Sequence, residues 1–124
     1  MEITVNEQPQ RFYLAINNKW EPAVGHEIKV GEYRFCAIPL SNRINISEVT
    51  SGARVLNIPM TLEITMATAS KEGSVKFFYK VGESLKRIIG RAFDFNEQLA
   101  NMKKTAFERL GEMPPIENVD VEAI

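Results

Sequence analysis

Apolar and polar residues alternate along the first half of the chain, and this pattern predicts short β-strands. A period of two places every second side chain on the same face of a strand. The segments that we interpret as strands are residues 11–16, 19–21, 33–38, 44–49, 55–58 and 62–66. In the last of these, Leu62, Ile64 and Met66 alternate with polar residues, so this strand is expected to bury one face.

Residues that favour turns separate these segments. Asn17 and Asn18 tolerate a left-handed backbone, which predicts a hairpin at this position. Residues 50–52 supply a second turn, and Pro39 and Pro59 end strands because proline has no backbone N–H donor. Since hairpins join antiparallel neighbours, the first half of the chain should form an antiparallel sheet.

After residue 68 the spacing of apolar residues changes from two to three and four, which predicts a helix. Its N-cap is expected within residues 68–70, with Glu72 in the first turn, where the helix dipole favours an anion. One apolar stripe should cover the sheet, and it consists of Phe78, Val81, Leu85, Ile88, Ile89 and Ala92. Gly82 would permit a close approach of another segment to this helix.

A second helix is predicted from about Phe95 to Leu110. Asp94 and Glu97 have the spacing of a capping box, and Gly111 stands where a helix ends in the left-handed conformation. Residues 114–115 are both proline, which prevents continuation. The apolar stripe of this helix consists of Phe95, Leu99, Met102, Ala106 and Leu110.

Composition agrees with a single domain, because 44% of the 124 residues are apolar and 25% are charged. We predict one α+β domain over residues 1–124. It has an N-terminal antiparallel β-sheet (residues 1–68), then two C-terminal α-helices (residues 69–111) and an acidic tail (residues 112–124). No stretch approaches the roughly 20 apolar residues of a membrane span, and the first residues lack the basic start of a signal peptide. We therefore expect a cytoplasmic protein with no membrane partner.

Charge is distributed unevenly, although the formal net charge is only −1. Residues 69–111 carry 9 basic and 5 acidic side chains, whereas residues 112–124 carry 4 acidic and no basic ones. The tail is expected to lie across the basic segment, to be a solubilising end, or to add an edge strand from Ile116. A sequence pI of about 5.9 argues against binding of DNA or RNA, which favours a basic protein.

Most catalytic chemistry is not expected. Cys36 is the single cysteine, so no internal disulfide forms, and we interpret it as packed within a strand. His26 is the single histidine and lies in a polar stretch, where we interpret it as a surface loop residue. The glycine-containing turns match neither a P-loop nor a dinucleotide fingerprint. We therefore predict no catalytic residues, no metal site, no cofactor and no enzyme activity.

The strongest functional pattern lies on the first predicted helix, beside its apolar stripe. Residues three and four apart share one helix face, and here they are Phe77, Lys80, Ser84, Arg87 and Arg91. Guanidinium groups bind phosphate through paired hydrogen bonds, and an aromatic ring can stack on a base. Asn96, Lys103 and Phe107 on the second helix, with Arg109 nearby, could form an opposing wall. The alternative is a solvated basic face, with Phe77 in the core or in a dimer interface.

The layout of the chain also resembles one known family, the first type of Thoeris anti-defence protein carried by phages. The resemblance is carried by residues 45–55 (NISEVTSGARV), by the change to a helix after residues 68–72 (TASKE), and by the basic paired helices that follow. It implies an N-terminal antiparallel sheet and C-terminal helices that assemble into dimers or larger oligomers. It also implies binding of cyclic ADP-ribose signals without cleavage, and some relatives also hold cyclic oligonucleotides.

These observations lead to one main functional hypothesis. The chain is expected to be a non-catalytic, homo-oligomeric sponge for the cyclic nucleotide signal that TIR-domain enzymes make on infection. Its predicted ligand-binding residues are Phe77, Arg87, Arg91, Asn96, Lys103 and Arg109. If this helix face is not the site, the loops with Arg43 and Arg54 are the next candidates. The alternative function is a protein-interaction module that inhibits a host enzyme by direct contact.

Overall fold

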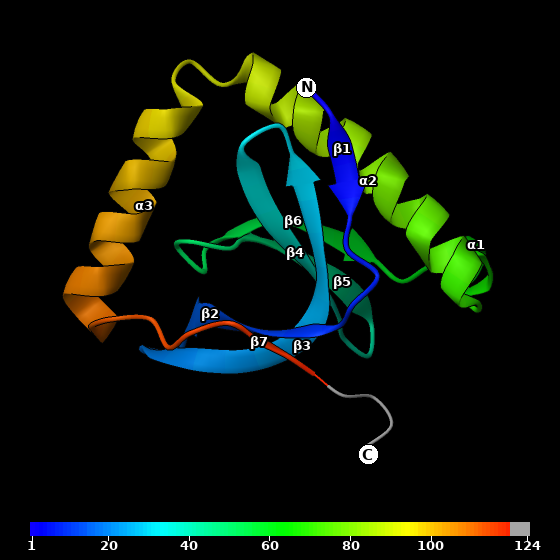
Figure 1. Cartoon of the computed structure of the whole chain (residues 1–124), viewed down its shortest axis with the longest axis horizontal. Coiled ribbons are helices and arrows are strands. Elements are labelled where there is room, and N and C mark those ends of the chain that lie inside the picture. The colour runs from blue at the N-terminus through cyan, green and yellow to red at the C-terminus, as the bar shows by residue number, and fades with distance from the viewer. Residues whose placement is uncertain (120–124) are drawn as a thin grey trace.

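The computed structural model describes residues 1–119 and confirms the α+β class, with an N-terminal antiparallel sheet followed by helices. The strands are β1 (Ile3–Val5), β2 (Gln10–Ile16), β3 (Lys19–Val30), β4 (Tyr33–Pro39), β5 (Arg43–Glu48), β6 (Arg54–Pro59) and β7 (Glu117–Asn118). The helices are α1 (Leu62–Ala67), α2 (Lys71–Arg91) and α3 (Phe95–Leu110). The helices follow β6 directly, and the chain then returns to the sheet at β7 (Figure 1).

All strand pairs are antiparallel, and the strand order is β6-β5-β4-β3-β2-β7, with β1 paired to β3 outside this path. Asn17 and Asn18 form the predicted hairpin turn between β2 and β3, with φ of 53° and 61°. Gly52, with φ of 67°, provides the turn between β5 and β6. Both turns lie where the sequence predicts them.

Strand β3 belongs to both halves of the sheet. Its first half, as far as Gly25, pairs with β2, and its second half, from His26 to Val30, pairs with β4. Gly25 stands between the two halves, and a Cβ atom there would collide with the carbonyl oxygen of Ala37. Only glycine therefore allows β4 to approach β3 so closely at this point.

The two faces of the sheet bury different apolar clusters, because successive side chains of a strand point to opposite faces. Helix α2 lies across one face, where Phe35, Ile46 and Leu85 are completely buried (Figure 1). On the other face, β2 packs toward β4 through Phe12, Leu14, Cys36, Ile38 and Val49. One part of the core thus lies between the sheet and α2, and the other lies between β2 and β4 on the opposite face.

Helix α2 begins and packs as its sequence predicts. The side chain of Ser70 accepts a hydrogen bond from the backbone N–H of Gly73 and caps the helix. Gly82 faces β1, where a Cβ atom would lie 2.5 Å from Cγ2 of Ile3. The close approach that Gly82 was expected to permit is therefore made to strand β1, which the alternation pattern did not predict.

Residues 62–66 were expected to form a strand, and this prediction is wrong because they belong to helix α1. Thr61 caps the helix by accepting a hydrogen bond from the N–H of Ile64, and Glu63 lies in its first turn. Leu62 and Met66 are four residues apart, so both lie on one face of the helix. That face points into solvent, with Leu62 and Met66 exposed by 75% and 70%.

The acidic tail adds an edge strand, which is one of the expected alternatives. Strand β7 pairs with β2 through Gln10 and Arg11, and Arg11 also forms an ion pair with Glu117 at 3.4 Å. The tail therefore lies along β2 and not across the basic helices, as far as residue 119. The remaining residues of the predicted tail, 120–124, lie outside the described part of the chain.

Within residues 1–119, no helix is long and apolar enough to cross a membrane.

Candidate functional site

The predicted basic face of α2 is present, but Phe77 is not part of an open stacking surface. Phe77 is half-buried and packs against the main core, with its ring centroid 6.2 Å from that of Phe78. Arg87 and Arg91 are exposed, and Arg87 donates a hydrogen bond to the hydroxyl of Ser84 at 3.1 Å. The arginines are thus available to solvent, whereas the phenylalanine serves packing.

The predicted residues of α3 are spread along the helix, with Asn96 near its start, Lys103 in its middle and Arg109 near its end. Asn96 near the start accepts a hydrogen bond from the hydroxyl of Tyr33 at 2.5 Å. In the middle of the helix, the ammonium of Lys103 lies 5.5 Å from the centre of the Phe107 ring. Arg109 donates to the side chain of Asn18 in the hairpin turn.

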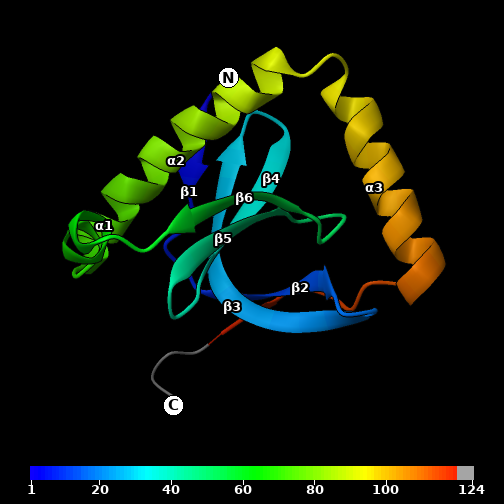
Figure 2. The same cartoon turned by 180° about the vertical axis from the view of Figure 1, so that it is seen from behind.

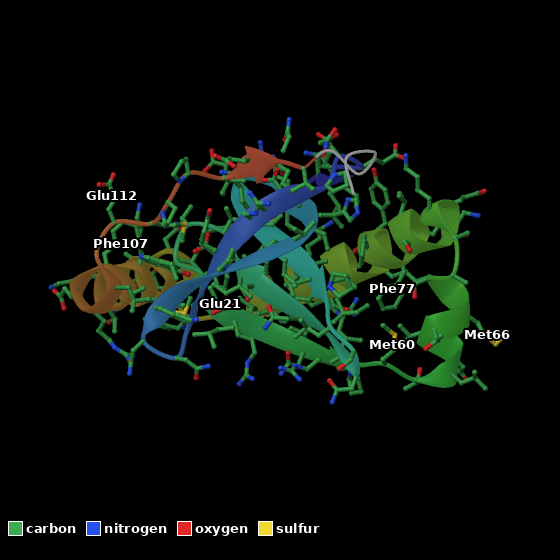
Figure 3. The ribbon with its side chains drawn as sticks, turned by 90° about the horizontal axis from the view of Figure 1, so that it is seen from below. Glu21, Met60, Met66, Phe77, Phe107 and Glu112 are labelled. Carbon is green, nitrogen blue, oxygen red and sulfur yellow. The ribbon has the colours of Figure 1, made fainter. Side chains whose placement is uncertain are left out.

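The structure does not bring the predicted residues of α2 and α3 together into one site. The two helices diverge from the connection at residues 92–94 (Figure 1). Phe77 and Phe107 consequently lie at opposite ends of the molecule (Figure 3). In one chain, α3 therefore does not provide the opposing wall for the basic face of α2.

A cavity of about 550 Å³ lies between α3, the turn of the β2–β3 hairpin and the start of β6, and we call it the α3 cavity. Its lining residues are Ala15, Asn17, Asn18, Ala53, Arg54, Asn101, Met102, Thr105, Ala106, Arg109 and Leu110. Of the predicted site residues, Arg109 lines this cavity. So does Arg54, one of the two arginines that we considered as next candidates.

Helix α3 is fixed to the sheet at both of its ends, and the cavity lies along its second half, from Asn101 to Leu110. At its start, the ring of Phe95 packs edge-on against Tyr33, with centroids 5.0 Å apart. At its end, the Phe107 ring packs edge-on against Trp20, with centroids 5.6 Å apart, and the indole N–H donates to the carbonyl of Gly111 at 3.3 Å. The end of α3 thus meets the β2–β3 hairpin (Figure 2).

The cavity wall opposite α3 depends on a buried carboxylate. Glu48 is 2% exposed, and its oxygens accept hydrogen bonds from the backbone N–H groups of Thr50 and Ser51, each at 2.9 Å. These bonds shape the turn before β6. The carbonyl of Gly52 then accepts from the N–H of Ala15 at 3.0 Å, so the turn is joined to β2. This arrangement places Arg54 at the cavity.

The lining of the α3 cavity is electropositive. It contains two guanidinium groups, and none of its lining residues in the described chain is acidic. Asn17, Asn18 and Asn101 add amides that can both donate and accept hydrogen bonds. Arg43, the other arginine considered, does not line the cavity and donates instead to Asn42 at 3.1 Å. A ligand with negative charge and several hydrogen-bonding groups fits this lining.

The sequence did not identify Asn17, Asn18 and Asn101 as site residues. Asn17 and Asn18 were recognised for their backbone conformation, and the same left-handed turn also presents their side chains to the cavity. Asn101 and Thr105 are four residues apart and share one face of α3 with Met102 and Arg109 beside them. The polar face beside the apolar stripe of α3 was the one sequence signal that could have identified these lining residues.

Two predictions about single reactive residues have different outcomes. Cys36 is buried as expected, and burial raises the pKa of its thiol to about 12. His26 is not a surface loop residue, because it lies in β3 opposite Ala37 and is partly buried. Its ring packs near Phe78, with centroids 5.9 Å apart. A strand that continues through Pro22 and Gly25 was not evident from the polar sequence around it.

The size of the α3 cavity falls within the range of roughly 300–1,000 Å³ that is typical of small-molecule sites. Its arginines and amides give it the chemical character of an anion site, built where helix, hairpin and turn meet. No family model matches the chain, and neither does any curated protein or solved structure.

Proposed function

We propose that this protein binds a small phosphorylated, nucleotide-like ligand in the α3 cavity and does not convert it. The observation that carries the proposal is the position of Arg54 and Arg109 on the wall of one cavity of about 550 Å³. A guanidinium presents five N–H donors in a planar fork that matches the oxygens of a phosphate. Two such groups at one cavity favour a ligand with more than one negative charge.

The other lining groups suit the remaining parts of a nucleotide. Amides such as Asn101 can form hydrogen bonds with the edge of a base or with ribose hydroxyls. Met102 and Leu110 supply apolar surface against which a ring can lie. Asn18 already accepts one hydrogen bond from Arg109, which holds the guanidinium at the cavity while other N–H groups remain for the ligand.

The resemblance to Thoeris anti-defence proteins extends this proposal to a biological role. The ligand would be a cyclic ADP-ribose isomer or a cyclic oligonucleotide, held without cleavage in the cytoplasm of an infected host cell. Sequestration removes the signal only while the ligand stays bound, so this role requires tight binding. Arginines that bond to phosphate favour such binding, because charge-assisted hydrogen bonds are about twice as strong as neutral ones.

We further propose that the protein forms a homo-oligomer through its helices. Phe93, between α2 and α3, is 102% exposed, and α1 exposes Leu62 and Met66. Large apolar side chains at the helical side of the molecule favour contact with a second copy.

The same exposed residues favour a second candidate function, which is direct contact with a host enzyme. A protein partner would bury the apolar face of α1, where Leu62 and Met66 lie four residues apart, and would leave the α3 cavity empty. The two candidates therefore use different surfaces and respond to different substitutions.

Thermal shift and calorimetry with cyclic ADP-ribose isomers and cyclic di- and trinucleotides test the proposal. A ligand at 100 times its dissociation constant stabilises the folded protein by about 2.7 kcal/mol, which shifts the Tm of a small domain by several degrees. Arg54→Ala and Arg109→Ala should each weaken binding by roughly one to two decades. Arg43→Ala is the matched control, since it removes the same charge outside the cavity.

Arg87→Ala and Arg91→Ala test the basic face of α2 in the same assay. If these variants bind less tightly and the cavity variants bind as the parent does, the ligand occupies the α2 face. If no compound in the panel shifts the Tm, direct contact with a protein becomes the better explanation. Recovery of unmodified ligand after heat denaturation would show that binding occurs without conversion.

A further inference from the structure

A second pocket, of about 290 Å³, lies where the segment between β1 and β2 passes the start of α2. We call it the His26 pocket. One part of its lining is apolar and consists of Val5, Pro9, Val75 and Phe78. It shares no lining residue with the α3 cavity, so it is independent of the function proposed above.

The chemistry of the pocket depends on the tautomer of His26. Its Nδ1 lies 3.0 Å from the carbonyl oxygen of Asn6. A carbonyl only accepts hydrogen bonds, so Nδ1 must carry the proton, and the neutral ring presents a lone pair at Nε2. Among the described residues, no buried side-chain nitrogen or oxygen lacks a partner. No hydrogen bond is formed by Nε2 among residues 1–119, so this nitrogen is not fully buried, and His26 is one of the residues that line the pocket.

Ser74 also lines the pocket and, like His26, presents a hydrogen-bond acceptor. Its hydroxyl donates to the carbonyl oxygen of Thr68 at 3.1 Å, which uses its only proton. Its oxygen keeps lone pairs that can accept a hydrogen bond. Both polar groups of the interior, the imidazole and the hydroxyl, are therefore acceptors, and a complementary ligand must bring the donor.

The charged residues of the pocket lie at its rim and pair with each other. The carboxylate of Glu7 and the ammonium of Lys71 are 3.5 Å apart, and both side chains are well exposed to solvent. Their opposite charges leave no formal net charge at the mouth, which favours a neutral ligand over an ionic one. The rings of His26 and Phe78, with centroids 5.9 Å apart, add an aromatic wall.

We propose that the His26 pocket binds a small, neutral aromatic compound that carries an O–H or N–H donor, of the phenol or indole class. The ring lies against Val5, Val75 and Phe78, and the donor forms a hydrogen bond with Nε2 of His26. Apolar contact supplies most of the affinity, and the hydrogen bond selects donors over compounds of the same shape that lack one.

A matched pair of probes, p-cresol and 4-methylanisole, tests this proposal on the unmodified protein. The two compounds have the same ring, but only p-cresol has an O–H donor. Because the chain has a single histidine, the imidazole nitrogens give one unambiguous set of NMR signals. We expect p-cresol to shift the Nε2 resonance in a saturable way and to bind about tenfold more tightly than 4-methylanisole.

His26→Phe keeps an aromatic wall and removes the Nε2 acceptor, so p-cresol should lose most of its advantage over 4-methylanisole, with only the Ser74 oxygen left as an acceptor. Lys104→Ala, which removes an exposed lysine of α3 that does not line the pocket, is the control and should leave the preference unchanged. Equal dissociation constants for the two probes on the parent protein would overturn the proposal, whether or not the His26→Phe variant folds. Absence of saturable binding, or shifts confined to the α3 cavity, would also overturn it.

Discussion

The side chain of Asn18, at the tip of the β2–β3 hairpin, accepts a hydrogen bond from the guanidinium of Arg109 near the end of α3. The two residues are 91 positions apart in the chain. This bond and the Trp20–Gly111 hydrogen bond attach the end of α3 to the hairpin. The attachment defines one end of the α3 cavity, because both Asn18 and Arg109 line it.

Substitutions of Asn18 should separate the role of its backbone from that of its side chain. Asn18 has φ of 61°, so Asn18→Ala should destabilise the fold by about 1–2 kcal/mol through left-handed strain. Asn18→Gly accepts this conformation and should lose less, although it also removes the bond to Arg109. Urea denaturation measures both values. Equal losses for the two variants would show that the side-chain contact, and not the turn, matters for stability.

Two glycines of α2 should respond to alanine in opposite directions. Gly82→Ala places a Cβ atom 2.5 Å from Ile3, and we expect a loss of about 1–3 kcal/mol in the free energy of unfolding. A Cβ atom at Gly90 would have open space within 4 Å, so Gly90→Ala should gain up to about 1 kcal/mol from helix propensity. Thermal or urea unfolding gives both differences. A stabilised Gly82→Ala variant would mean that β1 does not pack on α2 in solution.

The cap of α3 should contribute measurably to stability. The carboxylate of Asp94 accepts a hydrogen bond from the N–H of Glu97 at 3.0 Å. Asp94→Ala should cost about 1 kcal/mol, whereas Asp94→Asn keeps a capping oxygen and should stay within about 0.5 kcal/mol of the parent. Urea denaturation monitored by circular dichroism tests this pair. If both variants are as stable as the parent, the cap is not formed.

Cys36 should be unreactive in the folded protein and should make stability depend on alkaline pH. Burial raises the pKa of its thiol from 9.0 to about 12, so the unfolded chain loses this proton first as the pH rises. The contribution of the protonated thiol is complete below pH 9 and declines between pH 9 and 12. Cys36→Ala lacks this contribution, so the parent should lose more stability than the variant over that range. Rapid modification of the native thiol at pH 8 would contradict the burial.

Phe93 should affect association and not folding. Its side chain is 102% exposed, so Phe93→Ser should change the free energy of unfolding by no more than about 0.5 kcal/mol. Light scattering at micromolar concentration should show a larger species for the parent and a shift toward a single chain for the variant. A parent protein that scatters as one chain of 14.1 kDa would exclude the proposed oligomer.

The sequence predicts most strands and both long helices because their signals are local. Asp94 and Ser70 cap helices, and the Asn17–Asn18 pair forms its turn, through contacts with residues close by in the chain. Helix α1 was missed because Leu62, Ile64 and Met66 alternate as in a strand, whereas in the helix Leu62 and Met66 share the exposed face and Ile64 packs against the core. Such short segments carry too little periodicity to distinguish the two structures.

The candidate site was less predictable because it joins residues that are distant in sequence. The pattern along α2 correctly identified exposed arginines, but no local pattern shows that α2 and α3 diverge. The cavity instead brings together Asn18, Arg54 and Arg109 through the hairpin, the turn held by Glu48, and the end of α3. Likewise, the burial of His26 follows from the length of β3, which Pro22 and Gly25 concealed.

The continuity of β3 has a consequence for cooperativity. Its 12 residues carry the hairpin at one end and the central pairing with β4 at the other, with no loop between them. We therefore expect the hairpin and the central strands to open together, because the same strand is hydrogen-bonded in both. Amide hydrogen exchange in β2 and β4 should therefore slow together when the α3 cavity is occupied. Binding at the α3 cavity should thus stabilise the centre of the sheet as well as the hairpin, because β3 is hydrogen-bonded in both.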